Sequence, residues 1–177
     1  MDPFITLQYA WPGTWFHARS LTTIVSSTHL LYMPRIRVSE TLPFSPRQIY
    51  DLVVNVEQYP QFLPWCVKSR VWDLQPHQFM AELTVSFKGI RESFQTLDIV
   101  IPEKKVEINL KSGPFQYLVS TWMFLETGQG TKVDFFIDFK FDSRMKEMIM
   151  GPVFSQVSKQ MIGAFRKRAM ALYGQGA

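Results

Sequence analysis

The chain has few of the residues that catalytic and metal sites most often use. Its 177 residues include one cysteine, Cys66, and only one histidine, His77, lies in the region that we expect to fold. A lone cysteine excludes an internal disulfide, and one Cys with one His is too few for a zinc site of the Cys/His type. We interpret Cys66 as a small core residue and His77 as a solvated turn residue. Neither a catalytic group nor a catalytic cofactor is expected.

Long apolar runs and strong net charge are also missing. No stretch reaches the roughly 18 apolar residues that a membrane-spanning helix needs. The net charge of +4 is small and its basic residues are dispersed, so nucleic acid is not the expected partner. A modest positive charge is compatible with contact to an anionic membrane surface. These features predict a soluble or peripheral protein.

The first part of the chain lacks acidic residues. None occurs from Pro3 to Ser39, where Arg19, Arg35 and Arg37 are basic and Ser and Thr are frequent. That composition is typical of an organelle-targeting presequence, although a disordered tail has the same appearance. We therefore expect residues 1–33 to be a mitochondrial presequence or a disordered tail, and residues 34–174 to form the folded domain.

Within that domain, period-two alternation of apolar and polar residues is frequent. It is clear in 79–88, 106–111 and 133–141 and weaker in 67–74, 90–101 and 117–127, which predicts half-buried strands with short connections. A first strand is expected near 36–42, followed by a helix from Ser45-Pro46 to about Asn55 and a short turn bracketed by Pro60 and Pro64. After Asp142-Ser143, apolar residues recur at helical spacing up to Gly174.

This order of elements predicts an α+β helix-grip fold. A curved antiparallel sheet of about seven strands would wrap around one long C-terminal helix, because the sheet has a single apolar face to bury. The fifteen Phe, five Trp and nine Met residues suit an internal cavity, but they suit a filled core equally well. Periodicity does not distinguish a hollow interior from a solid one.

Several stretches of sequence resemble the START-like superfamily of polyketide cyclases and lipid-transport proteins. Within it, the chain is most similar to the mitochondrial coenzyme Q-binding START-like family and its bacterial relatives. The resemblance covers roughly residues 34–173. The residues that carry it are Tyr59-Pro60-Gln61-Phe62-Leu63-Pro64-Trp65-Cys66, Ser112-Gly113-Pro114-Phe115, Trp122, Phe124, Phe135 to Phe141 and Gly151-Pro152-Val153-Phe154.

The resemblance implies a function without known catalysis. It implies binding of ubiquinone (coenzyme Q) in an apolar cavity, and support of respiratory electron transport and quinone biosynthesis. It also implies a peripheral position on the matrix side of the mitochondrial inner membrane, in contact with its lipid, with the quinone biosynthesis complex as a candidate partner. The bacterial relatives begin near Met33-Pro34, which agrees with the expected presequence.

Candidate site residues lie in the proline-containing run after the first helix, on the expected strands and on the terminal helix. The expected ligand-binding residues, each of which could instead be plain core, are Phe62, Leu63, Trp65, Phe87, Phe115, Trp122, Phe135, Phe139, Phe154, Val157, Met161 and Phe165. The proline-containing run Tyr59–Cys66 is the expected gate. Lys159, Arg166 and Lys167 are candidates for membrane contact, and a merely solvated helix face is the alternative.

Two other classes of function stay open. Bacterial relatives include proteins thought to act on the ribosome, so the chain could interact with RNA, although no basic cluster with interleaved aromatics appears. A cyclase-like enzyme would need an inward-facing carboxylate, for which Glu92 and Asp98 are the candidates. Asp134 and Asp138 fall on the polar face of their strand, where we expect them to be solvated.

Overall fold

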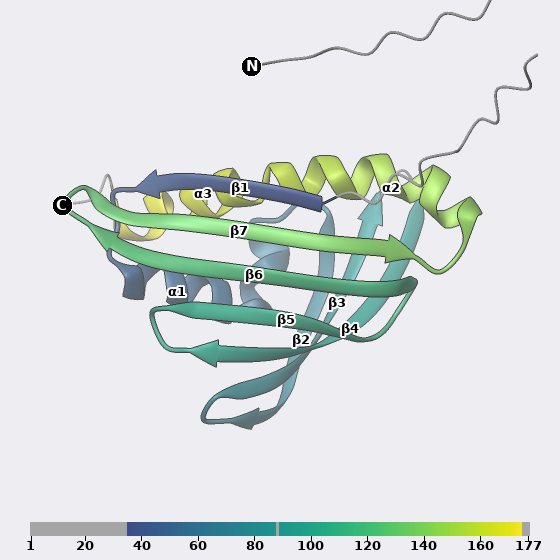
Figure 1. Ribbon diagram of the computed structural model, residues 1–177, viewed down its shortest axis with the longest axis horizontal. Coiled ribbons are helices and arrows are strands. Elements are labelled where there is room, and N and C mark those ends of the chain that lie inside the picture. Colours follow the sequence, from purple (N-terminus) through teal and green to yellow (C-terminus); the bar gives the residue numbers. More distant parts are fainter. Residues whose placement is uncertain (1–34, 88, 175–177) are drawn as a thin grey trace, which may run out of the picture. The chain divides into compact units, whose positions relative to one another are not determined.

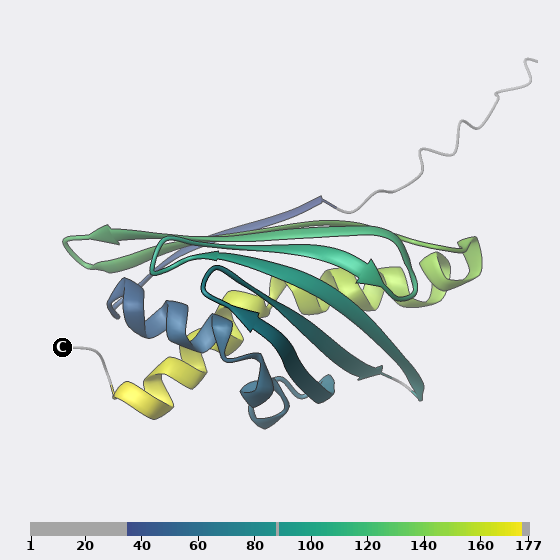
Figure 2. The same cartoon turned by 90° about the horizontal axis from the view of Figure 1, so that it is seen from below.

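Seven strands form one antiparallel sheet, and the helices lie together on one of its faces (Figure 1 and Figure 2). The computed structural model describes residues 35–87 and 89–174, with the side chain of Phe87 left out. The expected presequence in residues 1–33 lies outside the described residues. No helix in the described part of the chain is long and apolar enough to cross a membrane.

The strands are long and the connections between them are short. Their bounds are β1 Arg35–Leu42, β2 Cys66–Gln75, β3 Gln78–Phe87, β4 Ile90–Ile101, β5 Lys105–Ser112, β6 Phe115–Thr127 and β7 Gly130–Phe141. The helices are α1 Pro46–Val54, the 3-10 helix η1 Val56–Gln61, α2 Arg144–Lys159 and α3 Met161–Tyr173. The strand order is β1-β7-β6-β5-β4-β3-β2, so β2 to β7 form a meander and β1 pairs with β7. The predicted helix-grip fold is confirmed.

The first helix begins where the sequence predicts it. The Ser45 hydroxyl accepts a hydrogen bond from the Gln48 N–H, and the Gln48 side chain accepts one from the Ser45 N–H. This capping box, with Pro46 in the first turn, satisfies donors that a helix start otherwise leaves free. The buried face of α1 consists of Ile49, Leu52 and Val53. The following 3-10 helix contains Pro60 rather than starting after it.

The C-terminal region differs from the single long helix that the sequence predicts. Helix α2 ends at Lys159, Gln160 caps it, and α3 starts at Met161. The buried residues of α2 are Gly151, Ser155 and Ser158, whereas α3 buries Ile162, Phe165 and Ala169. The break lets each half present a different face to the sheet. Small residues on α2 also fill less of the space beneath it than a continuous apolar stripe would.

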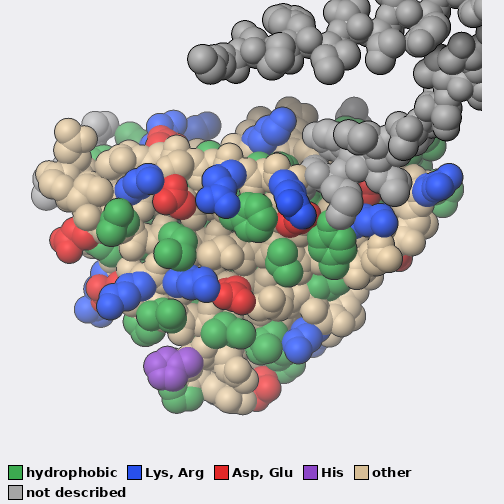
Figure 3. Space-filling view, in the orientation of Figure 1, with side chains coloured by type: hydrophobic (Ala, Val, Ile, Leu, Met, Phe, Trp, Pro, Cys, Tyr) green, Lys and Arg blue, Asp and Glu red, His purple; other side chains and the backbone are tan. Residues whose placement is uncertain are grey.

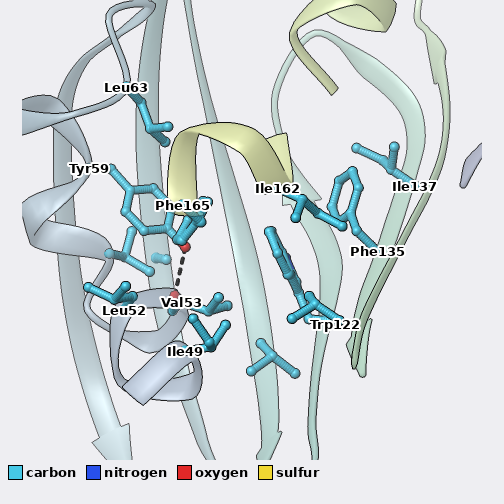
Figure 4. Packing of buried hydrophobic residues seen from close by; sticks show 14 of the residues in the cluster. Ile49, Leu52, Val53, Tyr59, Leu63, Trp122, Phe135, Ile137, Ile162 and Phe165 are labelled. Carbon is cyan, nitrogen blue, oxygen red and sulfur yellow. Dashed lines mark hydrogen bonds between the residues drawn. The ribbon is translucent and has the colours of Figure 1, made fainter. Parts of the chain in front are cut away.

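Aromatic side chains form the part of the core where α3, η1 and the sheet meet (Figure 4). Phe165 is 1% exposed, and its ring lies 4.9 Å from the ring of Trp122 and 5.4 Å from that of Tyr59 (centroid to centroid). The Tyr59 hydroxyl donates a hydrogen bond of 2.6 Å to the Val53 carbonyl, which ties η1 to α1. This cluster fixes the position of α3 against the sheet.

The polar-face pattern predicted that Asp138 is solvated, but the structure shows that it is buried. Arg35 Nε on β1 lies 2.8 Å from Asp138 Oδ2, and the Tyr117 hydroxyl on β6 donates to Asp138 Oδ1 at 3.1 Å. These two long side chains cover the carboxylate from both neighbouring strands. Alternation assigned Asp138 to the outer face of the sheet, but it gave no information about what covers that face.

Candidate ligand-binding cavity

Two hollows lie between the concave face of the sheet and the C-terminal helices. Each has a volume of about 80 Å³. The first lies against η1, β3 to β7 and both helices, and the second lies between α2 and the ends of β3 and β4. They are adjacent, because Trp65, Val85, Phe154 and Val157 line both. The interior is therefore hollow, but it is divided in two by side chains.

Most of the twelve expected ligand-binding residues surround this space. Seven line the first hollow: Trp65, Trp122, Phe135, Phe154, Val157, Met161 and Phe165. Phe62 instead lines an outer groove, and Leu63 is 0% exposed within solid core. Phe115 and Phe139 line neither hollow and instead pack against Phe141 and against Phe154, which borders both hollows. The side chain of Phe87 is outside what the structure describes.

Further lining residues come from strand faces that the sequence analysis did not single out as a site. Leu83 and Val85 lie on β3, Ile108 lies on β5, and Leu118 and Ile137 lie on β6 and β7. Leu83, Val85, Ile108 and Ile137 share the predicted apolar face of their strand with other residues of that face. The alternation was thus sufficient to find them. Their moderate size made them less conspicuous than the aromatic residues.

A large groove on the surface lies next to the hollows. Its volume is about 970 Å³, and it runs between β1, the segment after η1 and the α2–α3 junction. The three residues expected to contact a membrane, Lys159, Arg166 and Lys167, all line it. Arg166 forms an ion pair with Glu40, whereas Arg168 donates to the Gln61 side chain at 2.7 Å and lies over the Phe62 ring.

Trp65 is the one residue that the groove and both hollows have in common. It lies in the loop between η1 and β2 and is only half-buried. Its carbonyl accepts a hydrogen bond of 2.9 Å from the Ser86 N–H, so the backbone is fixed to β3 while the indole borders all three spaces. This position is consistent with the expected gate in the Tyr59–Cys66 run.

One end of the first hollow is polar. Asp98 and Thr96 on β4 and Ser120 on β6 line it, and all three are buried. Burial raises the pKa of Asp98 from its ordinary value of 3.8 to about 7. Among the described residues, neither Asp98 Oδ1 nor Thr96 Oγ1 has a hydrogen-bond partner. The cavity therefore contains polar atoms that nothing in the described protein satisfies.

The other candidate chemical groups stay outside the cavity. Glu92 lies toward the start of β4 and does not line the first hollow, and His77 lies in the turn between β2 and β3. Cys66 is buried, and burial raises the pKa of its thiol to about 11, as expected for an inert core residue. Among residues 35–87 and 89–174, no three His, Cys, Asp or Glu side chains gather as a metal site.

Comparison with known families identifies the class of protein. The family model "Polyketide cyclase / dehydrase and lipid transport" matches residues 42–166, and the chain belongs to this family. Two solved structures with the same fold are a START superfamily protein from Mycobacterium smegmatis and the Zhui aromatase/cyclase from Streptomyces sp. R1128. Their TM-scores are 0.67 and 0.71, at 17% and 12% identity. They cover 78% and 82% of this chain, and 98% and 100% of their own.

Curated relatives are similar enough to compare by sequence. The ribosome association toxin RatA of Escherichia coli is 35% identical over 144 residues, which is 81% of this chain and 91% of that protein. The coenzyme Q-binding protein COQ10 homolog B, mitochondrial, of Xenopus laevis is 33% identical over 171 residues. That match covers 93% of this chain and 70% of the frog protein. The relatives that are similar in sequence are thus named for ribosome association and for coenzyme Q binding, whereas the aromatase/cyclase shares only the fold.

Proposed function

We propose that this protein binds a polyprenyl quinone of the ubiquinone type in its cavity and carries it, without acting as an enzyme. We place this role at the matrix side of the mitochondrial inner membrane, in support of respiration and quinone biosynthesis. The observation that carries the proposal is the pair of apolar hollows beneath α2 and α3. The similarity to a coenzyme Q-binding protein over 93% of the chain supports the same reading.

The size of the hollows sets a condition on this function. An apolar cavity of about 150 Å³ is known to hold a benzene ring, whereas each hollow here measures about 80 Å³. A quinone head therefore needs both hollows joined. The side chains between them belong to the loop residue Trp65, to Val85 on β3, and to Phe154 and Val157 on α2. A shift of α2 or a rotation of Trp65 would join the hollows without unpairing the sheet.

The surface around the hollows suits contact with a membrane. Helix α2 exposes Met145, Met148 and Ile149, and Ile149 also lines the second hollow. The groove, which Trp65 also lines, carries Lys159 and Lys167, whose positive charges suit anionic lipid headgroups. Each buried methylene of a polyprenyl tail is stabilised by about 0.8 kcal/mol, so the lipid leaves a bilayer only for an equally apolar lining. We infer that the tail passes between the bilayer and the cavity next to α2 and the groove.

Filling the cavity should remove the ligand without unfolding the protein. Val157 borders both hollows, so Val157→Phe places a ring in the space that a quinone head would occupy. After purification from a bacterial host that makes ubiquinone, we expect the wild type to carry close to one quinone per chain. We expect the variant to carry at least about fivefold less, measured by lipid extraction and mass spectrometry.

The matched control is Val119→Phe, the same substitution on the outer face of β6, where Val119 is 40% exposed. This control should keep the quinone of the wild type. Thermal melting of both variants checks that the loss is not caused by unfolding. A wild type that is free of lipid, or equal quinone in the two variants, would overturn the proposal. Leu63, another of the expected ligand-binding residues, is unsuited to such a test. It lies in the core, where the buried hydroxyl of Leu63→Ser would destabilise the fold.

Ribosome association is the second candidate, and the name of the Escherichia coli relative favours it. On the outer face of the sheet, basic and acidic side chains are interspersed (Figure 3), so the described residues of that face form no single basic patch for RNA. The basic groove is the better candidate surface. Sedimentation with ribosomes over a range of salt concentrations tests it. Binding that is lost with rising salt and weakened by Lys167→Glu, but not by Lys132→Glu on β7, would favour this second function.

A further inference from the structure

The polar end of the first hollow, when no ligand is bound, lowers the stability of the folded protein. Asp98 is 3% exposed and Thr96 is 1% exposed, yet Asp98 Oδ1 and Thr96 Oγ1 make no hydrogen bond within the described protein. Buried polar atoms nearly always form a hydrogen bond, so two such atoms without one, beside a cavity, indicate that a ligand supplies the hydrogen-bond partner. Both residues line the first hollow, and most of the other residues that line it are apolar.

The sheet register places these groups in a defined pattern. Asp98 and Thr96 are two residues apart on β4, and both therefore point to its concave face. Across the sheet, Asp98 pairs with Ile108 on β5, and Ile108 pairs with Ser120 on β6. Ser120 donates its hydroxyl proton to the Phe136 carbonyl at 2.8 Å, so toward the cavity its oxygen can only accept. Donors toward a ligand must come from Asp98 and Thr96.

We propose that Asp98 and Thr96 bind the head group of the ligand, with the protonated Asp98 carboxyl donating a hydrogen bond to a ligand carbonyl oxygen. This inference rests on the proposed quinone-binding function, and it names the feature of the ligand that the cavity selects. An oxidised quinone ring offers only acceptors at its two carbonyl oxygens. An apolar lining with a hydrogen-bond donor at one end fits the oxidised ring better than it fits a plain hydrocarbon tail.

The surroundings of Asp98 keep its proton available. Of the residues that line the first hollow, only Asp98 on β4 and Tyr59 on η1 are titratable; those from β3, β5, β6, β7, α2 and α3 are uncharged. Tyr59 uses its hydroxyl proton on the Val53 carbonyl, and burial together with Asp98 raises its pKa well above the ordinary value. Cys66 on β2, near Tyr59, is likewise protonated, since burial raises its pKa to about 11. No cation among these residues stabilises an ionised Asp98.

The proposal predicts a pH-dependent affinity for an oxidised quinone. A ubiquinone with a two-isoprene tail serves as the probe, and binding is measured by quenching of tryptophan fluorescence in the full-length protein. We expect the wild type to bind at least about tenfold more weakly at pH 9 than at pH 6, because an ionised Asp98 cannot donate. Asp98→Asn keeps a donor at every pH and should bind at both pH values without this dependence.

Asp98→Leu removes the donor and should bind about tenfold more weakly than the wild type at pH 6, with no dependence on pH. Asp134→Leu on the outer side of β7 is the matched control and should behave as the wild type. If the wild type binds the probe but Asp98→Leu keeps its affinity and pH profile, this inference is wrong and quinone binding survives. If the wild type binds no probe at either pH, the proposed function itself is wrong.

Discussion

At pH 8, Asp98→Asn should stabilise the folded protein by up to about 4 kcal/mol, because the pKa of Asp98 rises from 3.8 to about 7 on folding. Well below pH 4 the carboxyl is protonated in the folded and unfolded chains alike, and its ionisation then has no effect on the free energy of unfolding. Between pH 4 and pH 7 the unfolded chain ionises while the folded protein keeps the proton, so the wild type loses stability as the pH rises. Above pH 7 the whole penalty is present.

Urea unfolding of wild type and Asp98→Asn from pH 4 to pH 8 measures this difference. The difference in the free energy of unfolding should widen steadily from pH 4 to about pH 7 and then level off. Asp134→Asn, which removes a half-exposed carboxylate on the same sheet, should show no such widening. A gap for Asp98→Asn that is the same at every pH would mean that this carboxyl ionises normally in the folded protein.

A destabilising carboxyl at the floor of a cavity has a consequence for function. A group that lowers stability at neutral pH is expected where binding or catalysis uses it, since an apolar residue of similar size would fit the same wall at lower cost. A ligand that accepts a hydrogen bond from Asp98 would offset part of this penalty. Ligand binding and stability should then be coupled through the same proton.

The strands were predictable because their apolar residues alternate, and β4 shows where that signal fails. In β4 the polar residues Thr96 and Asp98 point inward, while Ile99 and Ile101 are on the outer face and partly exposed. That reversal removes the clear alternation, so neither face could be assigned from the sequence. The inward position of Asp98 became evident only from the sheet register.

The cavity itself was less predictable than the fold that contains it. Large aromatic residues on inward faces were expected to line it, yet Phe115 and Phe139 close against Phe141 and Phe154 instead. Whether an inward residue meets another side chain or empty space depends on what lies opposite. Here the opposite element is α2, whose buried Ser155 and Ser158 are too small to appear in any apolar periodicity.

Gly130→Ala should destabilise the protein by about 3–5 kcal/mol, which corresponds to a fall in melting temperature of roughly 10 °C. Gly130 starts β7 with a φ of +117°, a region that side chains other than glycine rarely adopt. A Cβ there would lie 2.1 Å from the Leu42 carbonyl oxygen and 2.9 Å from the Pro43 Cα. Both obstacles are backbone, so the link between β1 and α1 would have to move.

Gly128→Ala in the same turn is the matched control, because a Cβ at Gly128 meets nothing within 4 Å. It should change stability by less than about 0.5 kcal/mol, and equal effects of the two substitutions would contradict the packing described here. The close approach at Gly130 continues in the next residue, where the Thr131 hydroxyl donates to the Phe44 carbonyl at 2.7 Å. The start of β7 thus holds the segment that leads into α1. Since Val53 of α1 accepts the hydrogen bond from Tyr59, a change at this turn should also disturb the wall of the cavity.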